Sequence, residues 1–230
     1  MSGRRGVIGR GSDRLGARII PGMPPRSTAR VGTRHARAAV LGTLLAVAAV
    51  AAGCAAPAFD PSAPCTSDRR VAGAYPALEA LVPREFRDRG PDLLDSGRTC
   101  TDVALGTLKA HDVRELRFAG ATWVLGSSSG VSIAILEADE LQADWVAGFY
   151  EAGARAARNS LSVETSATEM DGRPASRIDT LNGESYQTVI VSPDGQRVRV
   201  VIVASFVREI QTKEAHEAVV AEAIAAAFPG

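Results

Sequence analysis

Residue types that carry most enzyme chemistry are scarce in this chain. Its 230 residues include three cysteines and three histidines, and aromatic residues make up 5% of the total. The sequence has no Gly-x-Gly-x-x-Gly fingerprint, no phosphate-binding loop and no Cys-x-x-Cys pair. Ser127, Ser128 and Ser129 lie between two predicted strands, whereas a nucleophile elbow needs a strand-to-helix turn. We therefore expect no catalytic residue, no metal site and no cofactor.

The net charge of zero hides an uneven distribution of charge along the chain. The whole sequence holds 26 basic and 26 acidic residues. Residues 1–53 contain nine arginines and one aspartate, so residues 54–230 hold 17 basic and 25 acidic residues, a net charge of −8. An acidic surface repels phosphate backbones and is not attracted to anionic lipid. The composition therefore argues against nucleic acid as a partner.

An apolar run behind a basic flank is the most informative segment. Residues 38–53 are small or apolar and follow the basic residues of 34–37. This arrangement is typical of a secretory signal peptide, and a run of about 15 residues is short for a membrane span of about 20. The tetrapeptide Ala51-Ala52-Gly53-Cys54 resembles the lipobox of bacterial lipoproteins. That resemblance implies cleavage between Gly53 and Cys54, acylation of Cys54, and a lipid-anchored location on the extracytoplasmic face of the cell membrane.

Two features of the leader leave alternatives open. The segment before the apolar run is unusually long, and a start at Met23 gives a leader of more usual length. The apolar run is also compatible with an uncleaved signal anchor, which has the same orientation because its basic side stays in the cytoplasm.

The remaining cysteines and the composition divide the rest of the chain. With Cys54 assigned to lipid, Cys65 and Cys100 form an even pair in an oxidising compartment, which predicts a disulfide bond; two free thiols are the alternative. Residues 54–73 are rich in proline and alanine and are expected to form a tether. Residues 74–230 are enough for one α+β domain.

Hydrophobic periodicity predicts the elements of this domain. Asp-Gly and Asn-Gly pairs mark hairpin turns, and alternating apolar residues mark the strands beside them. We expect an antiparallel sheet of about six strands covered by two long amphipathic helices, with an extra N-terminal helical segment. The expected strands lie near 116–125, 131–135, 163–168, 175–180, 184–191 and 197–206, and the expected long helices cover 139–157 and the residues after Thr212, with shorter helices at 76–87 and after Thr101.

From residue 114 to residue 228, the order of elements resembles the Mog1/PsbP-like fold of small envelope lipoproteins. The resemblance rests on this order and on Asp171-Gly172-Arg173-Pro174-Ala175, which leads into the run of hairpins. It implies a binding or accessory role and supplies no catalytic residues.

Two groups of side chains are candidate ligand contacts. Trp123, Trp145 and Tyr150 are placed to line a pocket between sheet and helix, with core packing as the alternative. Arg177 and Asp179 share one face of a predicted strand, and Glu184 lies across the turn that follows, so the three are expected to form a small polar patch or a solvated surface.

Two histidines lie outside the leader. His111, beside Asp112 at a predicted helix end, and His216, flanked by Glu214 and Glu217, are predicted to be surface residues. A metal site needs at least three converging ligands, and no such spacing is present.

These observations favour a lipid-anchored envelope protein with a non-enzymatic binding or accessory role. Its expected partners are membrane lipid through acylated Cys54 and either an envelope protein or a small apolar ligand. The alternative is an envelope hydrolase or glycan-active enzyme whose carboxylates meet only in space. A converged acidic pair with a raised pKa favours the enzyme, and an apolar pocket or patch favours binding.

Overall fold

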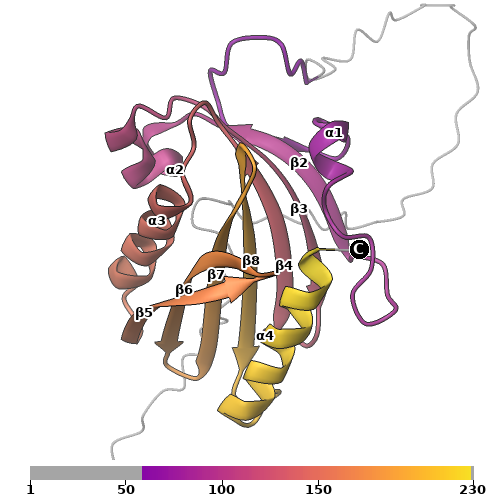
Figure 1. Ribbon diagram of the computed structural model, residues 1–230, viewed down its shortest axis with the longest axis vertical. Helices are drawn as coiled ribbons and strands as arrows, with labels where there is room; N and C mark the ends of the chain where they lie inside the picture. Colours follow the sequence, from indigo (N-terminus) through magenta and orange to yellow (C-terminus); the bar gives the residue numbers. More distant parts are fainter. Residues whose placement is uncertain (1–58, 229–230) are drawn as a thin grey trace, which may run out of the picture.

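Eight strands pair into a single antiparallel sheet in the order β1-β2-β3-β4-β8-β7-β6-β5 (Figure 1). The computed structural model describes residues 59–228. The strands are β1 (Arg69–Val71), β2 (Leu93–Thr99), β3 (Leu116–Val124), β4 (Gly130–Glu137), β5 (Ser160–Met170), β6 (Arg173–Asn182), β7 (Ser185–Asp194) and β8 (Arg197–Phe206). The helices are α1 (Pro76–Glu79), α2 (Asp102–Leu105), the 3-10 helix η1 (Gly106–His111), α3 (Ala143–Ala156) and α4 (Lys213–Ala227).

The hairpin turns were predicted correctly. Strands β5 to β8 follow one another through tight turns and pair antiparallel, each with the next. In the first of these turns Asp171 has φ 54° and Gly172 has φ 68°. Two successive residues with positive φ match the right-handed twist of a hairpin, which is why Asp-Gly is favoured there.

The prediction of about six strands covered by two long amphipathic helices is wrong, although an antiparallel sheet with helices is compatible with the α+β class. The sheet has eight strands, and the two longest helices have 14 and 15 residues. The additional strand β1 lies within residues 54–73, β2 lies between the two short helices expected near the N-terminus, and α1 is only four residues long. Strand β2 contains Asp95, Ser96 and Gly97, which have low strand propensity, so its pairing with β3 and not its own sequence makes it a strand.

Gly97 is required for this edge of the sheet. It pairs with Arg70 of β1, and a side chain at Gly97 would collide with the backbone of Arg69 and Arg70. β1 therefore approaches β2 only because β2 has a glycine at that position.

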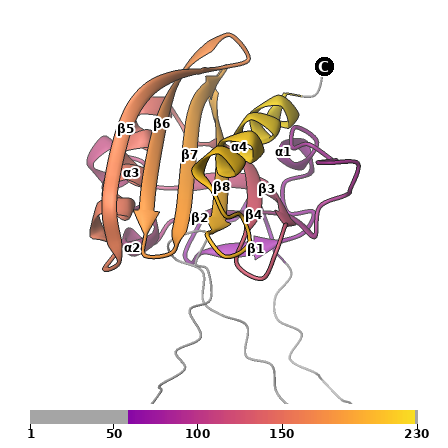
Figure 2. The same ribbon diagram turned by 90° about the horizontal axis from the view of Figure 1, so that it is seen from below.

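The two long helices, α3 and α4, lie on opposite faces of the sheet (Figure 2). Residues of α1 and α4 pack with one set of strand side chains, and residues of η1 and α3 pack with the other set. Strand β8 supplies both cores: Val201 and Val203 point to α4, and Val198, Val200 and Ile202 point to α3. A strand that is apolar on both faces must be covered on both faces, which explains why the sheet lies between two layers of helices.

The expected helix starts were partly correct. Thr212 caps α4, because its hydroxyl accepts a hydrogen bond from the Ala215 N–H at 3.1 Å. The helix expected from residue 139 starts later: Glu140 adopts φ 55°, and α3 begins only after Gln142.

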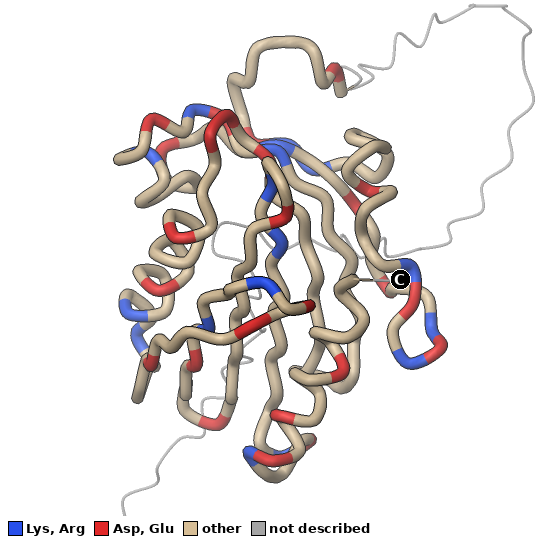
Figure 3. Tube along the Cα trace, in the orientation of Figure 1, with Lys and Arg blue, Asp and Glu red and all other residues tan. Residues whose placement is uncertain are grey.

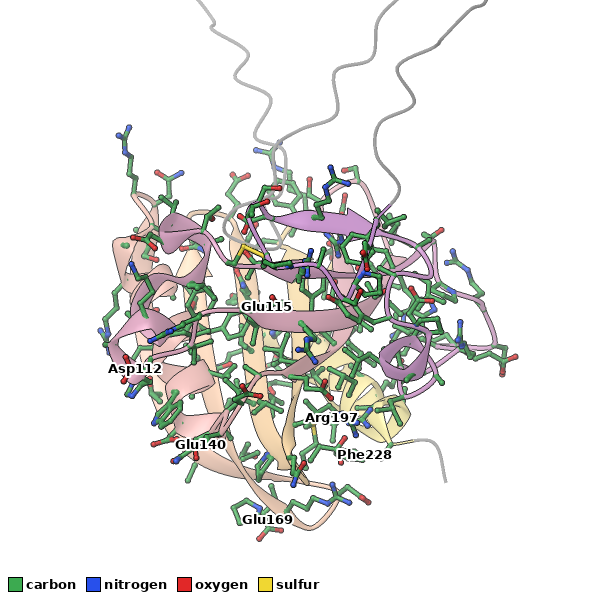
Figure 4. All side chains as sticks on the ribbon, turned by 90° about the horizontal axis from the view of Figure 1, so that it is seen from above. Asp112, Glu115, Glu140, Glu169, Arg197 and Phe228 are labelled. Carbon is green, nitrogen blue, oxygen red and sulfur yellow. A yellow bond between two sulfur atoms is a disulfide. The ribbon has the colours of Figure 1, made fainter. Side chains whose placement is uncertain are left out.

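The segment before β1 is fastened to the sheet. The sulfur atoms of Cys65 and Cys100 are 2.12 Å apart, so the predicted disulfide bond is confirmed (Figure 4). The sequence separation of 35 residues implies about 4 kcal/mol of stabilisation from loop-closure entropy. The buried Arg98 donates a hydrogen bond to the carbonyl oxygen of Ala63 at 2.6 Å and lies over the ring of Phe59. Gly53 and Cys54 lie outside the described residues.

Among residues 59–228, no helix has the length and apolar character needed to cross a membrane.

Arg199 of β8 joins three elements beneath the end of α4. It is 5% exposed, donates to the carbonyl oxygen of Ala227 at 2.5 Å and of Leu81 at 3.3 Å, and pairs with Asp194 at 2.8 Å. Its guanidinium lies 4.4 Å from the ring centre of Phe228. Burial disfavours the Asp194 carboxylate, but hydrogen bonds and charge from arginine outweigh burial and lower its pKa. Arg199 thus provides a partner for the buried carbonyl group of Ala227, which has none within the helix.

We expect Arg199→Leu to lower the free energy of unfolding by about 2–3 kcal/mol, because it leaves the buried carbonyl group of Ala227 without a partner and removes one of the two arginines that pair with Asp194. Arg208→Leu is the matched control: Arg208 pairs with Glu184 at the surface, and its loss should cost less than about 1 kcal/mol. Denaturant unfolding of both variants measures the difference. Equal losses would show that Arg199 has no special structural role.

Candidate functional site

A cleft of about 140 Å³ lies between the first turns of α4 and the strands β5, β6 and β7. We call it the α4 cleft. Strand pairing brings Glu164, Asp179 and Thr188 into one row across the sheet, since Glu164 pairs with Asp179 and Asp179 with Thr188. Residues paired across antiparallel strands share a face, so the three side chains point to the same side. The other polar groups and rings of the wall belong to Ser162, Thr180, Tyr186, Gln187, Lys213, His216 and Glu217.

A directed chain of hydrogen bonds runs beneath α4. The Thr188 hydroxyl donates to Oδ1 of Asp179 at 2.6 Å, so it must accept from Nε2–H of His216 at 2.9 Å. Nδ1 of His216 is then unprotonated and accepts from the Ser205 hydroxyl at 2.7 Å. The carboxylate at one end therefore fixes the tautomer of a neutral imidazole at the other.

Arg177 links the sheet to α4 through two carboxylates. Its Nε and Nη2 donate to the two oxygens of Asp179 at 2.7 and 2.9 Å. Nη2 also contacts both oxygens of Glu217 at 2.6 and 2.8 Å. One cation thus holds two acids that would otherwise repel each other.

The pKa shifts in this cluster follow from these contacts. Burial disfavours the Asp179 carboxylate, but hydrogen bonds from Arg177 and Thr188 outweigh burial and lower the pKa of Asp179. Burial lowers the pKa of His216 below its ordinary value of 6.5, against the opposing effect of Glu217 and Asp179. At neutral pH the cluster therefore contains an ionised Asp179 and an uncharged His216.

The chemistry of this arrangement favours structure and binding over catalysis. Ser205, His216 and Asp179 include the residue types of a hydrolase triad, but Thr188 lies between the histidine and the aspartate, and the Ser205 side chain is fully buried. A general acid needs a raised pKa, and the pKa of Asp179 is lowered. Within residues 59–228, no three side chains of His, Cys, Asp or Glu gather to hold a metal ion.

The aromatic residues expected to share one pocket lie on opposite faces of the sheet. Trp123 is buried beside Phe86 in the core under α4, and its indole N–H donates to the carbonyl oxygen of Arg89 at 3.0 Å. Trp145 and Tyr150 belong to α3 and pack against the other core. They therefore line no common site.

The polar patch was predicted in part. Arg177 and Asp179 do contact each other, at 2.7 Å. Glu184 is not their neighbour; it pairs with Arg208 at 3.1 Å, and Glu217 of α4 contacts Arg177 instead. The hairpin turn places Glu184 beyond the paired residues Asn182 and Ser185, at the end of the strands.

The prediction of a surface position is wrong for His216, which is 2% exposed. His111 is exposed and its ring stacks on that of Trp145 with centres 4.4 Å apart. The signal that could have found His216 is helical spacing, because it lies on the same stripe of α4 as Val220, Ala223 and Ala227, all of them buried.

No protein-family model and no curated protein sequence matches this chain. The resemblances to lipoprotein signal peptides and to the Mog1/PsbP-like fold therefore stay predictions.

We expect acid to destabilise the protein through His216. The unfolded chain binds a proton on this residue near pH 6.5, whereas the folded protein keeps the imidazole neutral to lower pH. The free energy of unfolding should therefore fall as the pH drops below 6.5, by at most about 1.4 kcal/mol per pH unit. Above that pH, His216 should contribute no pH dependence.

His216→Gln tests this, because an amide can accept from Ser205 and donate to Thr188 without titrating. Denaturant unfolding between about pH 7.5 and about pH 5 should show the slope in the wild type and in His111→Gln, the surface control, but not in His216→Gln. Parallel curves for the wild type and His216→Gln would contradict the interpretation.

Proposed function

We propose that this chain is a lipid-anchored protein of the extracytoplasmic face of the cell membrane, with a non-enzymatic binding role carried by the α4 cleft. The observation that carries the proposal is the basic flank, the apolar run and Ala51-Ala52-Gly53-Cys54 in that order. The cleft is proposed to bind a polar ligand or a polar segment of a neighbouring envelope protein.

The fastening of the N-terminal segment supports a position close to the membrane. Four residues separate Cys54 from Phe59, and a fully extended chain over this distance spans at most about 18 Å. From Phe59 onward, Arg98 and the Cys65–Cys100 bond hold the segment against the sheet. An acyl chain on Cys54 would thus keep β1 and β2 near the lipid surface.

The contacts of the α4 cleft favour binding over hydrolysis. The acidic pair that meets in space, Asp179 and Glu217, is bridged by Arg177, and the lowered pKa of Asp179 does not suit a general acid. Side chains held together by hydrogen bonds in this way form a rigid wall, which lowers the entropic cost of binding a ligand. Hydroxyl, carboxylate and ammonium groups line the cleft, so we favour a polar ligand over the small apolar one.

The anchor is tested by intact mass of the protein recovered from membranes, with and without reduction. We expect the mass of an acylated chain beginning at Cys54, which gains two hydrogens when the disulfide bond is reduced. Cys54→Ser should leave the membrane fraction with its leader removed, or stay there unprocessed and without lipid. An unlipidated wild-type chain that retains residues before Cys54 would overturn the anchor.

The binding role is tested by a photo-reactive side chain at Lys213, which is exposed and lines the cleft. Ala218 is the matched control, exposed on another face of the same helix. In intact cells we expect a discrete adduct from position 213 only, and its loss when Ser162→Trp fills the rim of the cleft. Adducts of equal yield at 213 and 218, or an adduct that survives Ser162→Trp, would contradict binding in the cleft.

A further inference from the structure

Strand β5 is a long edge strand with no element beyond it among the described residues (Figure 2). It has 11 residues, and positions 164–167 are exposed on both faces of the sheet. It contains no proline, glycine, lysine or arginine, the residues with which proteins commonly protect an edge. Its outer N–H and C=O groups are therefore available to pair with another strand.

The opposite edge of the sheet is protected. β1 has three residues, two of them arginine, and the disulfide bond fastens the segment that precedes it. The two edges thus differ in length, 11 residues against three.

From this difference we propose that β5 pairs antiparallel with β5 of a second copy of the chain. The twofold axis passes beside Ser166, perpendicular to the sheet, and the two eight-stranded sheets join into one. This inference goes beyond the proposed function and does not depend on the anchor.

The sequence of β5 is complementary to itself in this register. Ser166 faces Ser166 of the second copy, Thr165 faces Ala167, and Glu164 faces Thr168. Hydroxyl pairs of this kind stabilise antiparallel strands, and no two carboxylates lie directly opposite each other. Glu169 lies near the turn of the β5–β6 hairpin (Figure 4). In the proposed register it faces Val163 of the second copy.

Irregular pairing at one end of β5 selects this register. The pairing of β5 with β6 shifts between Ser160 and Ser162, so the regular part of the strand is 162–170. Ser166 is the centre of that part. A register centred two residues earlier would place Glu164 against Glu164 of the second copy, where like charges destabilise the pair.

Symmetry favours a closed dimer. β5 carries two acidic residues and no basic ones, so charge does not attract the two copies to each other, and the register has to keep their carboxylates apart (Figure 3). Pairing of β5 with β1 of another copy would build an open filament, but a three-residue partner leaves most of β5 unpaired. Pairing of β5 with itself closes after two copies.

The dimer would also enlarge the α4 cleft. Ser162 and Glu164 form its outer wall on β5. In the proposed register, Thr168 of the second copy lies next to Glu164. The two clefts of the dimer would thus each gain hydroxyl groups from the other copy.

Cysteine cross-linking of the full chain in its native membrane tests this pairing. A short bis-maleimide should join Ser166→Cys to itself, because the two positions face each other. Glu169→Cys is the matched control: two such positions lie about 20 Å apart along the strands and should not cross-link. Cells that express Glu169→Cys together with Val163→Cys should regain the cross-link, since these two positions are opposite.

A second variant separates misfolding from loss of the dimer. Thr165→Lys combined with Ala167→Lys places ammonium groups of the two copies opposite each other, and the neighbours of these positions on β6, Ile178 and Ser176, carry no charge. The double change should therefore abolish the cross-link between Val163→Cys and Glu169→Cys without altering the circular dichroism spectrum of the folded protein. Equal cross-linking of Ser166→Cys and Glu169→Cys would overturn the proposal. So would the absence of any cross-link at 166, or a product with the mass of a different partner.

Discussion

Strand β8 carries apolar side chains on both of its faces, and each row needs its own cover. Val201 and Val203 are fully buried toward α4, and Val198, Val200 and Ile202 are buried toward α3. Burial of apolar side chains stabilises the fold only where water is excluded, and β8 has apolar side chains on both faces. A helix must therefore pack on each face of the sheet. The positions of the α4 cleft, of Arg199 and of the two edge strands follow from this arrangement.

The face under α4 changes character along the helix. Its later turns rest on aliphatic side chains, whereas in its first turns His216 of the helix contacts Thr188 and Ser205 of the sheet. Buried polar groups are costly unless each has a partner, and here each ring nitrogen and each hydroxyl has one. A network satisfied in this way permits one register of α4 on the sheet and gives the cleft a fixed wall.

The ends of the sheet divide two kinds of interaction. At β1 the chain is fastened by Arg98 and by the disulfide bond, on the side that leads back toward Cys54. At β5 the backbone is open. Seven steps of about 4.8 Å separate these edges along an eight-stranded sheet, so the proposed membrane contact near β1 would leave the free strand β5 up to about 34 Å away.

Local signals in the sequence determined the hairpins, the cap at Thr212 and the pairing of Cys65 with Cys100, because turn chemistry, helix capping and cysteine number act over short distances or by elimination. The helical spacing of apolar residues after Thr212 also indicates that His216 is buried. Tertiary structure alone decided that Leu93–Thr99 is a strand and that the helices take opposite faces. It also brought Glu217 to Arg177 across 40 residues. Such contacts depend on which surfaces meet after the sheet has formed, and a local sequence pattern does not predict which surfaces these are.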